Sequence, residues 1–423
     1  MRGSLTALAL SLSLVMMACG GGGSGGSDDS SPAAPTNPVQ PPAPEPPTPE
    51  PPDPEPPGPE LPEPNPDGPT AYIFDLPPGF PEPLVPEDNP MTVEGVELGR
   101  HLFFDRRLSR NKQQSCGDCH QQRLAFSDGL ARAEGSTGEI HPRNASSLTN
   151  VAYNPTLTWM NPLLGLLEEQ ALAPIFSDDP VELGFSGRED ELLERLRSEA
   201  LYEVLFGNAY PDDEEPINLS NITKAIASFQ RTFISGSSLF DKFVYQGQDD
   251  ALSLDAKEGF LLFDSETLEC NHCHGGLNFA SSLTHAGNPN DPTPFENNGL
   301  YNLGEDGRYP WPNVGLYEFT ENERDFGRMK PPTLRNVEVT GPYMHDGSIE
   351  TLEGVVRHYE RGGTVTLDGA NAGDGRLNPN KSGFLTGFPL TSEQRFQLLE
   401  FLRSLTDHEF LSDPRFSNPF PDE

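Results

Sequence analysis

Cys116-Gly117-Asp118-Cys119-His120 is a Cys-x-x-Cys-His run, and the pattern returns as Cys270-Asn271-His272-Cys273-His274. In such a run the two thiols bond to the vinyl groups of one haem, and the histidine turns back as its proximal iron ligand. Two runs therefore predict two covalently bound c-type haems. The predicted attachment points and proximal ligands are Cys116, Cys119, Cys270 and Cys273, with His120 and His274.

The cysteine count supports this interpretation. The chain has five cysteines, four of which belong to the two runs, so no pair is left for a disulfide. A Cys-x-x-Cys run can also be a redox dithiol or half of a zinc site. Both copies carry the histidine, and a predicted export signal directs the chain out of the reducing cytosol, so haem attachment is favoured.

The first 19 residues are typical of a bacterial lipoprotein signal. Arg2 is followed by an apolar run over residues 5–17, too short for a comfortable membrane span, and then by Ala18-Cys19-Gly20. We expect Cys19 to become a lipidated N-terminus that anchors the chain in the outer membrane, on its periplasmic side. The alternative is an ordinary signal peptide that contains a cysteine, which would give a soluble periplasmic protein.

Residues 20–70 are rich first in Gly and Ser, then in Pro and Glu, and contain almost nothing that could form a core. They predict an extended, self-repelling spacer. The formal charge of the whole chain is 28 − 65 = −37. This charge makes nucleic acid and anionic lipid poor partners, so membrane contact is expected only through the lipid anchor.

Internal repetition predicts two domains. Residues 99–105 precede the first haem run and residues 259–264 precede the second, each with apolar residues at helical spacing. We therefore predict a mainly α fold of two cytochrome c-like domains, 71–248 and 249–423, with the haems near their interface. Further helices are predicted over 189–206, 222–232, 352–360 and 392–405.

Several blocks around these runs resemble the bacterial di-haem cytochrome c peroxidases and their relative MauG, over about residues 90–408. The blocks are Pro142-Arg143-Asn144, Leu167-Glu168-Glu169-Gln170-Ala171-Leu172, Pro180-Val181-Glu182, Pro332-Thr333-Leu334-Arg335-Asn336 and Gly341-Pro342-Tyr343-Met344-His345-Asp346-Gly347-Ser348. The resemblance implies an enzyme with hydrogen peroxide as oxidant. It makes the first haem the peroxide site and the second a six-coordinate reservoir.

Within that family, the segments 154–164 and 226–236 are similar to the MbnH branch. This similarity implies a paired Fe(IV) state and oxidation of a tryptophan to kynurenine on a small copper-binding partner, MbnP. Two alternatives stay open. One is a peroxidase that reduces hydrogen peroxide with electrons from small cytochromes or copper proteins. The other is a non-catalytic dihaem electron carrier.

The resemblance also assigns three residues around the peroxide site. Glu182 matches the distal glutamate of the family and Gln170 the distal glutamine. O–O cleavage needs a group that takes a proton from one oxygen and returns it to the other, and a carboxylate such as Glu182 can do both. Trp159 matches a tryptophan that relays electrons between the haems. Without the resemblance, Glu182 would be read as a surface acid and Trp159 as a core aromatic.

Two positions predict the resting ligation of the irons. Ser136 stands where a histidine can block the first haem in other members, so that haem is expected to be open, although His141 could still reach it. Tyr359 stands at the sixth-ligand position of the second haem, where a phenolate favours higher oxidation states. Its rivals are His358, Met344 and Met329.

The resemblance implies one further metal. Family members hold a calcium ion between their domains, and the matching oxygen donors are Asn144, Thr340 and Pro342. Asn144 could equally cap a turn.

Overall fold

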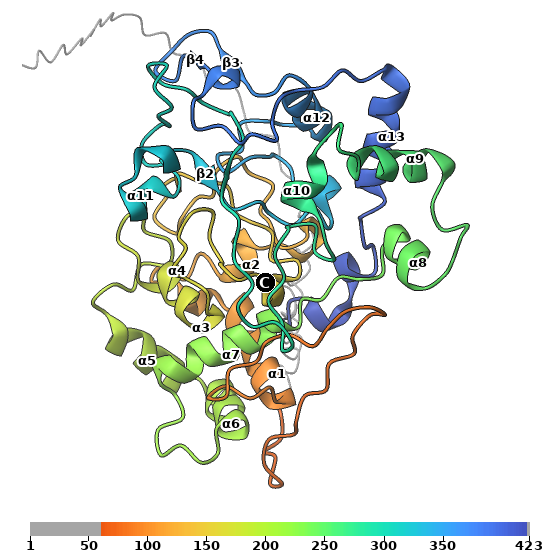
Figure 1. The fold of residues 1–423 in the computed structure, drawn as a ribbon. Helices are drawn as coiled ribbons and strands as arrows, with labels where there is room; N and C mark the ends of the chain where they lie inside the picture. The colour runs from red at the N-terminus through yellow and green to blue at the C-terminus, as the bar shows by residue number, and fades with distance from the viewer. Residues whose placement is uncertain (1–60, 421–423) are drawn as a thin grey trace, which may run out of the picture. The chain divides into compact units, whose positions relative to one another are not determined.

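The computed structural model describes residues 61–420 (Figure 1). The predicted signal segment, Cys19 and most of the predicted spacer lie outside the described residues. None of the helices within 61–420 combines the length and apolar character needed to cross a bilayer.

Thirteen α-helices and four two-residue strands make up the regular structure of the described chain, apart from short 3-10 turns. The helices are α1 (Val93–Phe104), α2 (Cys116–Cys119), α3 (Leu167–Gln170), α4 (Leu172–Phe176), α5 (Glu189–Arg197), α6 (Ala200–Ala209), α7 (Leu219–Arg231), α8 (Leu239–Tyr245), α9 (Leu254–Phe263), α10 (Cys270–His274), α11 (Tyr317–Thr320), α12 (Leu352–Glu360) and α13 (Ser392–Arg403). Strands β1 (Glu296–Asn297) and β2 (Arg328–Met329) pair antiparallel, as do β3 (Val365–Thr366) and β4 (Gly373–Asp374). The predicted mainly α class is confirmed.

The two repeated sequence blocks form α1 and α9, and each helix crosses a later one at very short range (Figure 1). A Cβ atom on Gly99 of α1 would lie 1.9 Å from the carbonyl oxygen of Ala225 in α7. A Cβ atom on Gly259 of α9 would likewise lie 1.9 Å from the carbonyl oxygen of Gln397 in α13. Only glycine permits such crossings. Each Cys-x-x-Cys-His run therefore follows the first helix of a tightly packed pair.

Two aromatic-rich clusters form the core. The first includes Phe126 and Phe233, whose rings stack with centroids 3.9 Å apart. The second is built around Phe401 of α13. Phe410 and Phe416, near the C-terminus, pack into the first cluster rather than the second. The last residues of the predicted C-terminal domain thus contact the N-terminal core, and the boundary at residue 248 stays a prediction.

The helix predicted over 189–206 is interrupted, because α5 ends at Arg197 and α6 begins at Ala200. The hydroxyl of Ser198 donates to the carbonyl of Arg195 at 2.7 Å, which competes with continued helix bonding. Helix α12 spans residues 352–360, as predicted. Helix α13 begins at the predicted Ser392, and its N-cap is the residue before it. Its cap is Thr391, which exchanges hydrogen bonds with Gln394 in a capping box.

Candidate active site

The first Cys-x-x-Cys-His run forms the short helix α2 and the residue after it. Ser115 caps the helix, and its backbone N–H and hydroxyl both donate to Asp118, at 2.8 and 2.9 Å. His120 is half-buried, and its Nδ1 lies 2.7 Å from the carbonyl oxygen of Phe126. A carbonyl only accepts, so Nδ1 carries the proton and Nε2 keeps its lone pair. This is the tautomer that an iron ligand needs.

The second run repeats this arrangement in α10. His274 is also half-buried, and its Nδ1 lies 3.1 Å from the carbonyl oxygen of Phe279. Burial lowers the pKa of both histidines, which keeps them neutral. In both sites, therefore, a hydrogen bond to a backbone carbonyl orients the histidine ring.

A cavity of about 310 Å³ lies beside the first run, and it gathers the residues predicted for peroxide chemistry. Gln170 lines it from α3, which the buried ion pair between Glu168 and Arg231 ties to α7 at 2.8 Å. Glu182 lines it from the loop after α4. Burial raises the pKa of Glu182, and the nearby Arg143 opposes that rise. A carboxyl with a raised pKa can both accept and return a proton.

His141 lines the same cavity and faces Glu182. Its Nδ1 accepts from the backbone N–H of Arg143 at 3.1 Å, while its Nε2 lies 3.9 Å from Glu182. Burial lowers the pKa of His141 to about 4, so the ring is neutral. Ser136 does not line this cavity, and its backbone N–H donates to the carbonyl of Glu182 at 2.8 Å. It positions the Glu182 loop through its backbone.

Trp159 lies between this cavity and a second one of about 150 Å³ beside His274, and it lines both. Its indole N–H donates to the carbonyl of Asn144 at 2.9 Å, and its own carbonyl accepts from the backbone N–H of Lys330 at 2.8 Å. The first hydrogen bond orients the ring, and the second holds the backbone of Trp159. Trp159 is therefore placed where a relay between the two sites would have to be.

Tyr359 lines the second cavity from α12, and burial raises the pKa of its phenol above the usual range. Met344 and Met329 line the same cavity. His358 points elsewhere: its Nδ1 lies 2.8 Å from the hydroxyl of Thr364 and its Nε2 lies 2.9 Å from the carbonyl of Asn298. With both ring nitrogens engaged, His358 is a poorer candidate for the sixth ligand than Tyr359.

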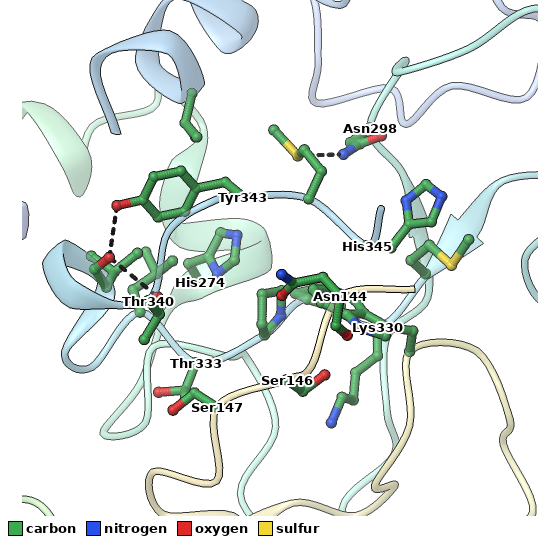
Figure 2. Close-up of a pocket in the computed structure, with 18 of the residues that line it drawn as sticks. Asn144, Ser146, Ser147, His274, Asn298, Lys330, Thr333, Thr340, Tyr343 and His345 are labelled. Atoms are coloured by element: carbon green, nitrogen blue, oxygen red, sulfur yellow. Dashed lines mark hydrogen bonds between the residues drawn. The ribbon is translucent and has the colours of Figure 1, made fainter. Parts of the chain in front are cut away.

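The three residues predicted to bind calcium, Asn144, Thr340 and Pro342, all line the second cavity. Figure 2 shows Asn144 and Thr340 there. The amide nitrogen of Asn144 donates to the carbonyl of Leu130 at 2.7 Å. No carboxylate joins these three in a metal-ligating group; within residues 61–420 the group of that kind is Glu266, Glu269 and His272. Calcium binding therefore stays a prediction.

The second cavity also holds basic groups that the sequence did not single out. Lys330 is buried, and its ammonium donates to the carbonyl of Thr156 at 2.8 Å, with no carboxylate of residues 61–420 within ion-pair distance. Burial lowers the pKa of Lys330 to about 8. His345 is also buried, and its Nε2 finds no hydrogen-bond partner in the described chain. Figure 2 shows both side chains around the pocket with His274.

These groups fit haem. Buried cations and polar atoms need partners, and the carboxylates of a haem are anionic acceptors that Lys330 and His345 could bind. The cysteine pairs would supply the covalent attachment, and His120 and His274 would supply neutral ring nitrogens as iron ligands. The donor set of both cavities thus matches the cofactor that the two runs predict.

Comparison with known proteins gives three close similarities. The profile of the family "Di-haem cytochrome c peroxidase" matches residues 93–250. The methylamine utilization protein MauG of Methylorubrum extorquens is 34% identical over 325 residues, 76% of this chain and 80% of its own. The cytochrome-c peroxidase IdrP1 of Denitromonas iodatirespirans is 33% identical over 365 residues, 82% of this chain and 91% of its own.

Among solved structures, a MauG-like protein associated with microbial copper homeostasis is 43% identical, with a TM-score of 0.80. The match covers 82% of this chain and 99% of that one. The diheme peroxidase BthA of Burkholderia thailandensis shares the fold, with a TM-score of 0.59 at 20% identity.

Proposed function

Because this chain belongs to the di-haem cytochrome c peroxidase and MauG family, whose members are peroxide-dependent oxidoreductases, we propose that it uses hydrogen peroxide to oxidise a tryptophan of a partner protein. The observation that carries the proposal is the position of Trp159, which lines both cavities and whose indole N–H is hydrogen-bonded to the carbonyl of Asn144. A relay there lets oxidising equivalents leave the peroxide site.

The family implies two haem c groups, held here by the two cysteine pairs with His120 and His274. When bound, the haems supply redox-active iron that accepts oxidising equivalents from peroxide. The protein residues supply the rest of the chemistry. Glu182, with its raised pKa, moves a proton from one peroxide oxygen to the other. Gln170 offers an amide that can orient peroxide in the same cavity.

The position of Tyr359 supports the proposal that the second haem site stores oxidising equivalents. It lines the second cavity, whereas the adjacent His358 has both nitrogens engaged elsewhere. A phenolate ligand stabilises higher oxidation states than a thioether does. The second site would then share the oxidising equivalents rather than donate stored electrons.

We take the partner to be a small copper-binding protein similar to MbnP. Two features support this: the resemblance of segments 154–164 and 226–236 to the MbnH branch, and the 43% identity to a MauG-like protein associated with copper homeostasis. Lipid anchoring through Cys19 would hold this protein on the periplasmic side of the membrane, the compartment in which we expect the partner.

The test is mass spectrometry of such a partner after reaction with the haem-loaded protein and hydrogen peroxide. We expect a tryptophan of the partner to become kynurenine, and we expect Glu182→Gln to slow the reaction by a factor of about 10² or more. Glu139→Gln is a matched control, because Glu139 lines the same cavity and accepts a backbone bond from Val181. A partner left unchanged by a protein that still reacts with peroxide would refute the proposal.

A second function is favoured by one observation. Met344 and Met329 line the cavity with Tyr359, so a thioether lies close to the second site, as suits a peroxidase fed by small cytochromes or copper proteins. Spectroscopy of the fully oxidised protein separates the two functions. A reaction with peroxide in the absence of reductant supports tryptophan oxidation, whereas a requirement for half-reduction supports the peroxidase.

A further inference from the structure

Trp311 is one of only two tryptophans in the chain, and it is 78% exposed. It lies in the loop between β1 and α11. Exposed tryptophan is uncommon because its ring gives up more apolar contact than most side chains when it faces water. Trp159, the other tryptophan, is partly buried between the cavities. One indole therefore lies at the centre of the enzyme and the other at its surface.

The loop of Trp311 is anchored to the segment that holds Trp159. Asn313 is buried, and its amide donates to the carbonyl of Pro142 at 3.0 Å. The same side chain accepts from the guanidinium of Arg143 at 3.4 Å. Two residues after Pro142, the carbonyl of Asn144 accepts the indole N–H of Trp159 at 2.9 Å.

This gives a short path through the protein. Trp311 and Asn313 are two residues apart, as are Pro142 and Asn144, and each such stretch spans at most about 8 Å between Cα atoms. Two hydrogen bonds of 3.0 and 2.9 Å join the stretches to each other and to Trp159. The path begins at an oxidisable ring in solvent and ends at the ring beside both cavities.

The geometry points to Trp311 as the surface residue through which this enzyme takes electrons from protein donors that are too large to enter its cavities. The inference rests on the proposed function and adds the contact point. Each transfer takes one electron from the donor to oxidised Trp311, which returns to its starting state. Two electrons and two protons convert one hydrogen peroxide into two waters.

Charge indicates the kind of protein that docks there. The segment after Trp311 carries Glu318, Glu321 and Glu323, and the whole chain has a formal charge of −37. A basic donor surface is therefore favoured at this loop. A basic mitochondrial ferrocytochrome c is a suitable macromolecular probe, and tetramethyl-p-phenylenediamine is a small probe that needs no surface relay.

The test compares Trp311→Phe and Trp311→Tyr with the wild-type holoenzyme. With peroxide and ferrocytochrome c, Trp311→Phe should slow oxidation at least about tenfold, whereas Trp311→Tyr, which keeps an oxidisable ring, should restore most of the rate. Oxidation of the small probe should not change. Leu367→Ala is the control for loss of an exposed apolar side chain, since Leu367 is 89% exposed in another loop.

A second measurement needs no donor. With peroxide alone, the indole of Trp311 should lose two electrons and two protons in total and gain one oxygen atom from water, while one hydrogen peroxide takes up those electrons and protons to give two waters. Peptide mapping should locate the added oxygen at Trp311. Trp159→Phe should prevent this uptake because it removes the inner relay. Equal ferrocytochrome c rates in wild type and Trp311→Phe would overturn the inference.

The two hypotheses fail differently. If the partner tryptophan is modified equally by wild type and Trp311→Phe, the relay is wrong and the proposed function stands. If the partner is unmodified while ferrocytochrome c oxidation depends on Trp311, the relay stands and the proposed substrate is wrong.

Discussion

Asp241 and Arg335 form a fully buried ion pair, and replacing Asp241 with asparagine should destabilise the protein strongly. Their side chains are 1% and 0% exposed, and one guanidinium nitrogen lies 2.9 and 2.8 Å from the two carboxylate oxygens. Asparagine has nearly the same size but presents an N–H₂ group and no charge. The Arg335 guanidinium would then stay buried without a counter-charge, which costs about 3–5 kcal/mol of unfolding free energy.

Two further contacts connect this pair to the second haem site. Arg335 donates through Nε to the carbonyl of Leu277 at 2.9 Å, and Leu277 follows His274 by three residues. Asp241 also accepts from the backbone N–H and hydroxyl of Ser238, at 3.1 and 2.7 Å, which caps α8. The substitution should therefore change the absorption of the second haem as well as stability.

Guanidinium chloride denaturation of the holoenzyme gives the free energy of unfolding for each variant. Glu353→Gln is the control, because its ion pair with Arg357 lies on an exposed face of α12 and should contribute little. Arg335→Lys keeps the charge but loses the Nε hydrogen bond to the carbonyl of Leu277, so its free energy of unfolding should lie between those of the wild type and Asp241→Asn. A loss below about 1 kcal/mol for Asp241→Asn, as for an exposed pair, would refute the reasoning.

Four other predictions follow from the site. Tyr359→Phe should change the electron paramagnetic resonance signal of the second haem, whereas His358→Gln should leave its axial ligation unchanged because both His358 nitrogens are engaged elsewhere. Since burial lowers the pKa of His141 from 6.5 to about 4, the folded state resists a proton that the unfolded chain accepts. The unfolding free energy should therefore drop by up to about 3 kcal/mol as pH falls from 6.5 to 4. His141→Gln should remove that part of the pH dependence of the unfolding free energy, measured by denaturation at each pH. Lys330→Met removes a buried positive charge that stabilises reduced iron, so it should lower the reduction potential of the second haem by the equivalent of about 1 kcal/mol in spectroelectrochemical titration. Treatment with EGTA should remove the bound calcium, and Asn144→Ala should remove as much, as measured by elemental analysis. Calcium retained by the variant would contradict the predicted ligand set.

The parts of the structure that follow local rules could be predicted from the sequence. Helix α12 and the helices before each haem run depend on periodic apolar residues and caps, which act within a few residues. The break between α5 and α6 was missed, because Ser198 competes for a carbonyl within an otherwise helical pattern. Phe410 and Phe416 were assigned to the second domain because sequence order does not show which core a returning chain joins.

The candidate site shows the same division. Each Cys-x-x-Cys-His run carries its chemistry in five consecutive residues, so it could be recognised directly. The roles of Lys330 and His345 could not, because a single Lys or His, even within a recognised block as His345 is, is usually exposed or structurally satisfied. Their importance comes from burial beside a cavity that distant loops create. Likewise, only the contacts of His358 with Thr364 and Asn298 show that it is a poorer candidate for the sixth ligand than Tyr359.

The segment Pro142-Arg143-Asn144 connects the features on which the proposed function depends. The carbonyl of Asn144 holds Trp159, and its N–H donates to the carbonyl of His345 at 2.8 Å beside the second cavity. Pro142 holds the loop of Trp311 through Asn313, and Arg143 opposes the raised pKa of Glu182 at the peroxide site. A movement of these three residues would therefore alter proton transfer, the inner relay and the surface relay together. We therefore expect substitutions in this short block to lower activity, although it contains no metal ligand of the haem runs.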